Sequence, residues 1–180
     1  MNLTTDRLLL RELTWDDLED IHCLNSFLEV ARFNTLGIPK DLTTTREIIR
    51  STVENREKTP RTQYGWTIRL PEDNRFVGEA GMSLFPQRYR RSSIFYNLIP
   101  THWGKGYATE VAQALISFGF DYLQLHRIEA GAAVENVKSL RVLEKVGMTR
   151  EGIGRKILPT PAGWRDNYSY AILEDDPRGY

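Results

Sequence analysis

Cysteine is almost absent from this sequence, since Cys23 is the only one among 180 residues. A single cysteine excludes a disulfide within the chain and any zinc site built on several cysteines. Cys23 follows His22 in a predicted helix, and we interpret it as a small buried apolar side chain rather than a nucleophile. We expect no metal in this protein.

Long apolar runs are lacking as well. No stretch of about 18 apolar residues occurs, which is the length that a membrane-spanning helix needs. The first six residues carry neither a basic leader nor an apolar signal segment. We therefore expect a cytoplasmic protein with no membrane partner.

An excess of charge of either sign is also missing, because Lys plus Arg and Asp plus Glu both number 24. No global field draws the chain to nucleic acid, so a nucleic-acid partner is not expected. The local exception is the Arg-Tyr-Arg-Arg run at 88–91. Such a run is typical of a solvated connection between strands, and we leave it open as a docking patch for a partner.

The overall composition is that of an ordinary globular protein, with 41% hydrophobic and 27% charged residues. This balance favours neither a disordered nor a membrane protein. A chain of this length forms most simply one domain over residues 1–180, with a core of its own.

The first part of the chain predicts a strand followed by helices. Leu3–Leu13 is typical of a strand, and Thr14 can cap a helix over Trp15–Phe27. Residues 29–42 have mixed polarity and predict an irregular connection.

The middle of the chain begins with a capping box. Thr44 and Glu47 have the spacing of that motif, and the helix that they open should end near Lys58. Alternation with a period of two then predicts three strands, over 64–70, 76–84 and 94–98.

The last part alternates helices and strands. The spacing of apolar residues predicts a helix over 108–123, a strand over 128–134, a helix over 137–146 that Gly147 ends, and a hairpin of 148–158 with 164–174. A strand that follows a helical crossover should lie parallel to the strand before it. The predicted order is β-α-α-β-β-β-α-β-α-β-β, a mixed α/β (α+β) fold.

The most informative stretch of the sequence is the glycine-rich turn Trp103–Glu110, between a predicted strand and a helix. Gly104 and Gly106 have no Cβ to keep an anion away from the backbone, and a helix that begins here offers unpaired N–H groups. The turn therefore predicts a phosphate site. It is neither a dinucleotide-binding turn nor a P-loop, because Lys105 lies between the glycines and Thr109 comes too late.

The turn resembles the acyl-CoA-binding motif of the GNAT superfamily of N-acetyltransferases, Gln/Arg-x-x-Gly-x-Gly/Ala. Gly106 and Ala108 match that motif, and Trp103 takes the place of Gln/Arg. Tryptophan there is similar to the branch that includes the RimJ and RimL ribosomal-protein acetyltransferases. The resemblance implies the GNAT fold: a mostly antiparallel sheet of about seven strands with about four helices, in which the fourth and fifth strands are parallel and splay apart.

The resemblance also implies acetyl-CoA as the co-substrate. Its pantetheine arm would lie beside the fourth strand, where the backbone N–H of Leu98 would polarise the thioester carbonyl, and Pro100 ends the strand. Lys105 adds a charge to the backbone donors of the turn or is a solvated lysine. The residues expected to contact the cofactor here are Leu98, Ile99, Trp103, Gly104, Lys105, Gly106, Tyr107, Ala108 and Thr109.

A second block, Asn136-Val137-Lys138-Ser139, is similar to the Asn-x-x-Ser segment of the same branch. By that resemblance Asn136 contacts the pantetheine and Ser139 lies near the thioester sulfur. From the residues alone Asn136 is a good helix cap and Ser139 an ordinary first-turn residue. Many GNAT enzymes place a tyrosine as general acid where this chain has Leu143, so that role falls to Ser139 or to water.

The residue that takes the proton from the attacking amine is less evident. Glu79 and Glu129 lie in strands that should approach the cleft, and Asp166 lies at the start of the last strand. A chain of water molecules is an equal alternative. Glu110 belongs to the recognisable turn, but four residues into a helix it should stabilise the helix dipole or pair locally.

The acceptor of the acetyl group is left open between several classes. The resemblance implies transfer to a primary amine by direct attack in a ternary complex, with a protein or peptide N-terminal α-amine first. Small amines such as aminoglycosides or polyamines are the alternative, as is a non-catalytic CoA-binding module. A homodimer is a further expectation, for which the late tyrosines Tyr168, Tyr170 and Tyr180 are candidates.

Overall fold

The computed structural model describes residues 1–178. These residues form one open sheet of eight strands in the order β1-β2-β3-β4-β5-β6-β8-β7, against about seven strands expected. All neighbours are antiparallel except β5 and β6, which are parallel as predicted. The strands are β1 (Leu3–Thr4), β2 (Leu9–Glu12), β3 (Gln63–Arg69), β4 (Phe76–Leu84), β5 (Arg91–Leu98), β6 (Arg127–Ala133), β7 (Thr149–Thr160) and β8 (Gly163–Leu173).

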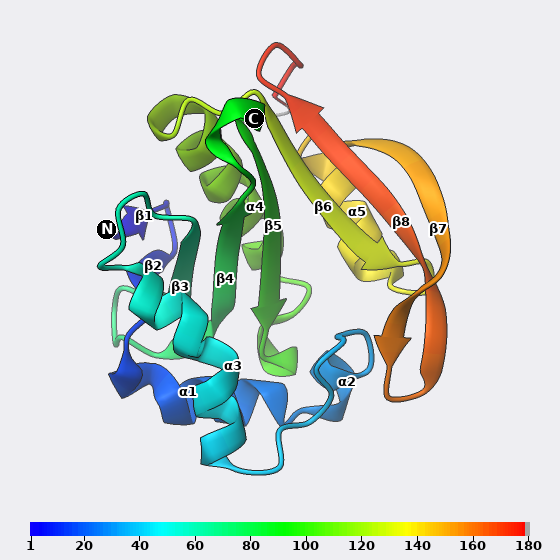
Figure 1. Ribbon diagram of the computed structural model, residues 1–180. Helices are drawn as coiled ribbons and strands as arrows, with labels where there is room; N and C mark the ends of the chain where they lie inside the picture. Colours follow the sequence, from blue (N-terminus) through cyan, green and yellow to red (C-terminus); the bar gives the residue numbers. More distant parts are fainter. Residues whose placement is uncertain (179–180) are drawn as a thin grey trace.

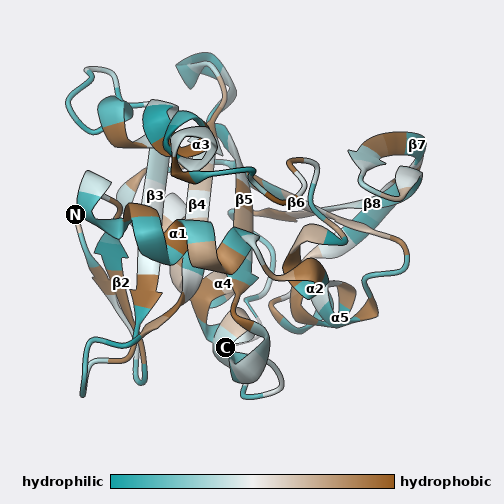
Figure 2. Ribbon diagram, turned by 90° about the horizontal axis from the view of Figure 1, so that it is seen from below, coloured by the Kyte–Doolittle hydropathy of each residue, from teal (hydrophilic) through white to brown (hydrophobic). Residues whose placement is uncertain are grey.

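Helices cover both faces of this sheet. They are α1 (Leu18–Asn25), α2 (Leu28–Ala31), α3 (Leu42–Asn55), α4 (Tyr107–Ser117) and α5 (Val137–Lys145). Figures 1 and 2 show α3 and α4 on opposite faces of the sheet, with α1 packed beside α3 and α5 beside α4. None of the helices within 1–178 is long and apolar enough to cross a membrane.

Three local predictions were wrong. The first strand is two short strands, because the Thr5 side chain accepts from the Leu8 N–H (3.0 Å) and turns the chain between them. Residues 28–31 of the expected irregular connection form α2. The cap of α3 is Asp41 rather than Thr44, because one Asp41 carboxylate oxygen accepts from both the N–H and the hydroxyl of Thr44.

Cys23 also departs from expectation, since its side chain is exposed. The buried side of α1 is filled by Ile21, Leu24 and Asn25, which leaves Cys23 on the outer side. The lone cysteine therefore plays no part in packing the core.

The core that positions the cleft lies between the sheet and α4. Val111, Ala112, Leu115 and Ile116 of α4 are fully buried against the sheet, as their spacing predicts. Gly119, just beyond α4, packs closely on β6, because a Cβ there would lie 2.6 Å from Cδ1 of Ile128. This packing fixes α4, and with it the turn that precedes it, relative to β5 and β6.

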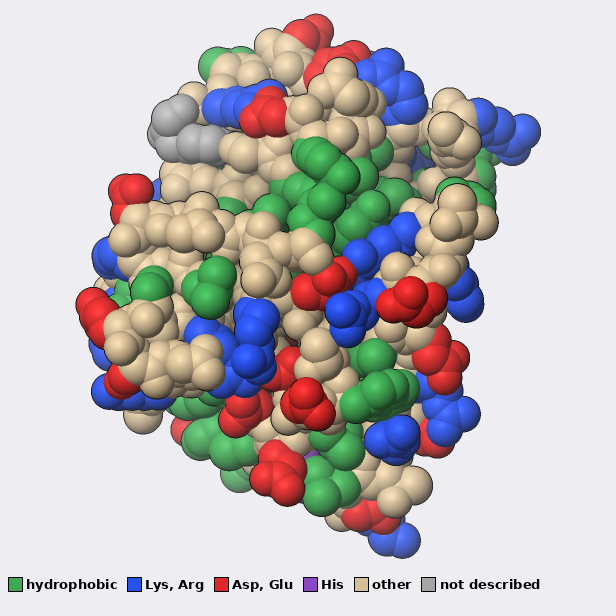
Figure 3. All heavy atoms as spheres, turned by 90° about the vertical axis from the view of Figure 1, so that its left-hand side faces the viewer, with side chains coloured by type: hydrophobic (Ala, Val, Ile, Leu, Met, Phe, Trp, Pro, Cys, Tyr) green, Lys and Arg blue, Asp and Glu red, His purple; other side chains and the backbone are tan. Residues whose placement is uncertain are grey.

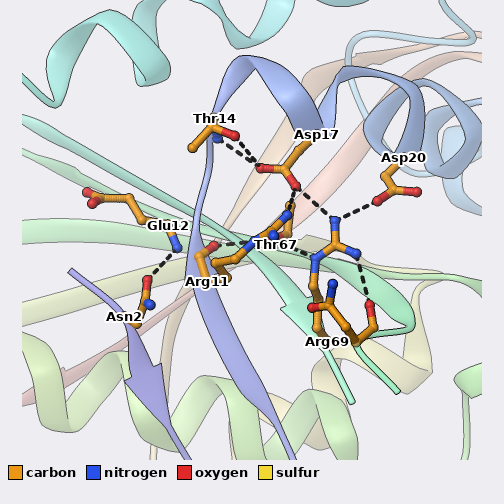
Figure 4. Close-up of polar contacts among 9 residues, drawn as sticks. Asn2, Arg11, Glu12, Thr14, Asp17, Asp20, Thr67 and Arg69 are labelled. Carbon is orange, nitrogen blue, oxygen red and sulfur yellow. Dashed lines mark hydrogen bonds and ion pairs between the residues drawn. The ribbon is translucent and has the colours of Figure 1, made fainter. Parts of the chain in front are cut away.

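A buried ion cluster fixes the other face of the sheet (Figure 4). Asp17 is fully buried and accepts from the guanidinium of Arg69 (2.8 Å), from Arg11 and from the Thr14 N–H (2.9 Å). Arg69 also donates to Asp20 at 2.6 Å. Burial alone would raise the pKa of Asp17, but these hydrogen bonds outweigh it and lower the pKa. The cluster ties the start of α1 to β2 and β3.

The splayed pair of strands is the feature that opens the sheet. The parallel ladder joins only Arg91–Ser93 of β5 to Arg127–Glu129 of β6. Beyond it the two strands diverge toward the lower end of Figure 1 and form no further ladder pairs; we call this separation of the two backbones the gap. The predicted splay of this pair is confirmed.

Candidate active site

The glycine turn lies at the open end of the splayed strands, where β5 passes through residues 100–102 into α4. Gly104 and Gly106 have φ of +76° and +83°, in the left-handed region that favours glycine. Both are exposed, and nothing lies within 4 Å of the position that a Cβ on Gly104 would take. The backbone at Gly104 therefore has open space beside it, and the helix that begins at Tyr107 adds unpaired N–H groups, as an anion site requires.

Arg7 holds this turn in place, and sequence reasoning missed it. Its guanidinium donates to the Lys105 carbonyl (2.9 Å) and to Glu110 (2.8 Å), and lies over the ring of Tyr107. Thr5 donates to Glu110 as well, at 2.5 Å. Burial would raise the pKa of Glu110, but its hydrogen bonds with Thr5 and Arg7 outweigh that effect and lower it. Glu110 thus pairs across about a hundred residues rather than locally, and no sequence signal marks that contact.

The edge of β5 turns a backbone donor toward the gap. The Ile99 N–H donates to the Val77 carbonyl of the β4 side at 2.9 Å. Consecutive residues of an antiparallel ladder point their N–H groups to alternate sides, so the Leu98 N–H points away from β4. The Leu98 N–H therefore faces the space between β5 and β6. The resemblance implies that this N–H polarises the thioester carbonyl there.

Trp103 connects the β5 side of the gap to the α5 side. Its indole N–H donates to the Leu98 carbonyl at 2.8 Å, and the ammonium of Lys138 on α5 lies 4.5 Å from its ring centre. A tryptophan in place of Gln/Arg therefore connects the end of β5 to the start of α5.

The second predicted block begins α5 at the other side of the gap. The Asn136 side chain caps α5 by accepting from the Ser139 N–H at 3.3 Å, which confirms the helix cap. The Ser139 hydroxyl lies 3.2 Å from the hydroxyl of Tyr96 on β5. Leu143 is only 1% exposed and belongs to the core, so that position offers no group to the gap. Gly147 ends the helix with φ +87°, as predicted.

The candidate bases differ sharply in their surroundings. Glu79 on β4 is partly buried, and the Asn97 amide on β5 donates to it at 3.0 Å. Burial raises the pKa of Glu79, and hydrogen bonds from Asn97 and Asn25 offset only part of that effect. Within residues 1–178 no Arg or Lys lies within ion-pair distance of Glu79. A carboxyl with a raised pKa and no cation partner suits a general base.

Glu129 and Asp166 are occupied by structural contacts. Glu129 lies at the closed end of the splayed pair, 2.7 Å from the Arg127 guanidinium and 3.5 Å from that of Arg91. Asp166 accepts from the Lys156 N–H at 2.8 Å, at an irregularity in β7. Of the three predicted carboxylates, Glu79 alone adjoins the part of β5 that borders the gap.

Two further hollows flank this region. One of about 360 Å³ is lined by polar groups of β5, β6, β7 and β8, among them Ser93, Arg127, Glu129 and Glu151. Arg127 donates to both carboxylates there, and Arg91 lies 3.5 Å from Glu129, so two guanidinium groups balance the two carboxylates. A larger hollow, of about 680 Å³, lies between β1 and α4 on the other side of the molecule.

Other predicted features find different places. Much of the Arg88–Arg91 patch is engaged within the chain, since Arg90 pairs with Glu174 and Arg91 lies over the Phe85 ring. Figure 3 shows acidic and basic side chains interspersed on the face that it presents. In residues 1–178 no group of three or more His, Cys, Asp or Glu side chains could hold a metal ion.

The tyrosines named for a dimer contact give that expectation no support. Tyr170 is buried and donates to Glu144 at 3.1 Å, Tyr168 is partly buried beside Arg150, and Tyr180 lies outside the described residues. A homodimer stays a prediction.

Comparison with known proteins identifies the class to which this fold and site belong. Residues 7–149 match the acetyltransferase (GNAT) domain family. The chain therefore belongs to the GNAT family and is an acyltransferase, which confirms the predicted family and enzyme class.

The similar proteins carry the same description. The uncharacterized N-acetyltransferase YnaD of Bacillus subtilis is 32% identical over 177 residues, which cover 98% of this chain and 99% of YnaD. The crystal structure of a GNAT acetyltransferase from Bacillus anthracis has a TM-score of 0.83 and 32% identity, with 98% of this chain and all of that one covered.

More distant structures share the fold alone. The spermidine N-acetyltransferase of Vibrio cholerae, in complex with CoA and spermine, has a TM-score of 0.82 at 21% identity, covering 96% of this chain and 98% of that one. The ribosomal-protein-S5-alanine acetyltransferase of Vibrio fischeri has a TM-score of 0.83 at 19% identity, covering 98% of each chain. The predicted likeness to the ribosomal-protein branch rests on structures of this kind.

Proposed function

We propose that this protein transfers an acetyl group from acetyl-CoA to a primary amine by direct attack in a ternary complex. The observation that carries the proposal is the glycine turn at the open end of the splayed β5 and β6. The N–H groups of residues 104–108 are positioned to hold a pyrophosphate, and Lys105 adds a positive charge beside them. The Leu98 N–H in the gap polarises the thioester carbonyl. The spermidine acetyltransferase of the same fold was crystallised with CoA.

The two reactants reach the gap from opposite faces of the sheet. The α4 face supplies the turn and the Ser139 hydroxyl, and therefore takes the cofactor. The α1 and α3 face supplies Glu79 with Asn97 and Asn25, and therefore takes the amine. Attack across the sheet needs no covalent enzyme intermediate.

Glu79 is the proton acceptor of this mechanism. An ammonium has no lone pair, so the amine must lose a proton before it attacks. An α-amine with a pKa near 8 asks less of a base than a lysine near 10.4. A carboxyl whose pKa burial has raised takes that proton, through water where the amine lies out of direct reach. The sulfur leaves as a thiolate beside Ser139, whose hydroxyl donates a hydrogen bond to it.

A protein or peptide N-terminus is the acceptor that the charges favour. A polyamine carries several positive charges and needs uncompensated carboxylates around it. In the polar hollow between β5 and β8, the charges of Glu129 and Glu151 are balanced by Arg127 and Arg91 together. Ser93, Asn167 and Ser169 there offer uncharged hydrogen-bonding groups, which suit a peptide backbone.

Release of free thiol from acetyl-CoA tests the proposal. A panel of N-terminal peptides, polyamines and aminoglycosides is supplied in turn, and we expect amine-dependent thiol release that is fastest with a peptide. Gly106→Val should abolish both acetyl-CoA binding and thiol release, because φ is +83° there and a Cβ would lie 3.3 Å from Arg7.

Gly152→Val is the matched control for that variant. Gly152 lies in β7, with nothing within 4 Å of its Cβ position, and the variant should keep both binding and turnover. Acetyl-CoA binding without thiol release on any amine would contradict the proposal and indicate a non-catalytic CoA-binding module.

A further inference from the structure

Only a few contacts bridge the gap between β5 and β6, and one of them involves a side chain that the mechanism has not used. The ladder between these strands ends at Ser93 and Glu129. Three residues further along β5, Tyr96 reaches past β6 to α5. Its hydroxyl lies 3.2 Å from the hydroxyl of Ser139 and 3.5 Å from the Ser139 carbonyl.

Either hydroxyl can be the donor of the contact at 3.2 Å, and the direction that serves the transfer is donation by Tyr96. A phenol has one hydrogen, and the carbonyl at 3.5 Å is at the limit of hydrogen-bond distance, so the Ser139 hydroxyl at 3.2 Å is the better acceptor. When Tyr96 donates to that oxygen, the hydrogen of Ser139 is free to point elsewhere.

The phenol is also a constant donor. Burial raises the pKa of Tyr96 to about 12, and the hydrogen bond with Ser139 offsets only part of that effect. Tyr96 therefore stays protonated across the pH range in which an enzyme works. Its ring lies on the face of β5 that Ile94 and Leu98 bury, which limits its movement.

We propose that Tyr96 is a positioning residue for the transfer, which holds the Ser139 hydroxyl so that its hydrogen points at the thioester sulfur. This inference rests on the proposed acetyl transfer. It explains how the chain works with Leu143 where a tyrosine is expected on α5: a tyrosine on β5 acts on the same region through Ser139.

The chemical step balances without a proton leaving either hydroxyl. The amine nitrogen attacks the carbonyl carbon, the carbon–sulfur bond breaks, and its electron pair goes to sulfur. The ammonium gives one proton to Glu79 before the attack, the nitrogen gives a second to water on the same side as it becomes an amide, and the thiolate takes a proton from solvent. Ser139 donates a hydrogen bond to the developing negative charge, and the Tyr96 bond to Ser139 strengthens that donor because linked hydrogen bonds polarise one another.

Tyr96→Phe removes one oxygen and keeps the ring, so it tests this role directly. We expect kcat to fall about tenfold, as for loss of one hydrogen bond that acts in the transition state. The Kd for acetyl-CoA should change less than about twofold, because the turn that holds the pyrophosphate is untouched. Rates are compared at a temperature at which circular dichroism shows both proteins folded.

Ser139→Ala and the double variant separate positioning from structure. If Tyr96 acts through Ser139, then Tyr96→Phe lowers kcat in the wild type but has no further effect once Ser139 is Ala. Tyr170→Phe is the matched control, because it removes another tyrosine hydrogen bond to α5, at Glu144, away from the gap. It should leave the rate of acetyl-CoA hydrolysis without an amine unchanged, because that reaction does not use the acceptor hollow that Tyr170 lines.

Hydrolysis of acetyl-CoA without an amine keeps this test independent of the acceptor. Water then replaces the amine, but the same thiolate leaves, and Tyr96→Phe should slow that reaction as well. Hydrolysis without transfer to any amine would contradict the proposed function. The effect of Tyr96→Phe on hydrolysis would still test the role of Tyr96. A Tyr96→Phe variant with wild-type rates, or losses that multiply in the double variant, would overturn the inference.

Discussion

Individual carboxylates in this protein differ more by surroundings than by type. Glu79 and Glu129 both lie on strands near the gap, and neither stands out from the other in the sequence. Glu129 pairs with Arg127 and Arg91, whereas Glu79 contacts only amides. The choice depends on contacts between strands, which single residues do not reveal.

Glu79→Gln should lower activity and raise stability together. Loss of a general base lowers kcat by about 10²- to 10⁴-fold. Glu129→Gln should lower kcat far less. Because folding raises the Glu79 pKa, the wild type loses stability as pH rises from the ordinary carboxyl pKa through the raised one. The Tm of Glu79→Gln should therefore exceed that of the wild type at pH 8, with the difference closing toward pH 4.

Activity and Tm measured across pH for both variants check this. In the wild type kcat/KM should fall as pH drops through a pKa above that of an ordinary carboxyl. An active Glu79→Gln variant with an unchanged pH profile would remove Glu79 from the mechanism and leave water as the proton acceptor.

At the scale of elements, periodicity and turn residues predicted most of the fold. The strands β3 to β6 and the helices α4 and α5 lie where apolar spacing placed them, although β3 and β4 are buried on both faces. The prediction that β5 and β6 splay apart rested on the resemblance to the GNAT family. The errors fall where short-range hydrogen bonds decide, as at Asp41.

Contacts between distant elements could not be predicted. Arg7 with Glu110, Tyr96 with Ser139, and Asp17 with Arg69 each join residues with no common pattern in the chain. Of the candidate site, the glycine turn and the helix cap at Asn136 were therefore predicted. The groups that hold them in position were not.

The cluster around Asp17 should be the most sensitive anchor between α1 and the sheet. Asp17→Asn leaves Arg69 and Arg11 without their shared carboxylate, and removing one partner of a buried pair costs about 3–5 kcal/mol. Urea unfolding measures this loss. Asp73→Asn, which affects only an exposed pair with Arg75, should shift the midpoint little.

The same pair of variants has a pH signature. Folding lowers the Asp17 pKa, so its contribution is complete above the ordinary aspartate pKa and is lost as pH falls through the lowered one. The stability gap between the wild type and Asp17→Asn should therefore narrow in acid. A gap that stays constant down to pH 2 would show that Asp17 acts by packing alone.

The whole molecule is a sheet opened at one point and covered on both faces. Helices α4 and α5 fix the cofactor side of that opening, while the ion cluster fixes α1 on the acceptor side. Trp103 and Tyr96 on the β5 side contact Lys138 and Ser139 at the start of α5, on the other side of the opening. The central claim is that acetyl-CoA occupies this opening.

A crystal structure of the protein with CoA tests that claim most directly. We predict the pyrophosphate within hydrogen-bond distance of the N–H groups of residues 104–108 and the sulfur in the gap beside Leu98 and Ser139. CoA bound elsewhere, for instance in the 680 Å³ hollow between β1 and α4, with the gap between β5 and β6 empty, would contradict it.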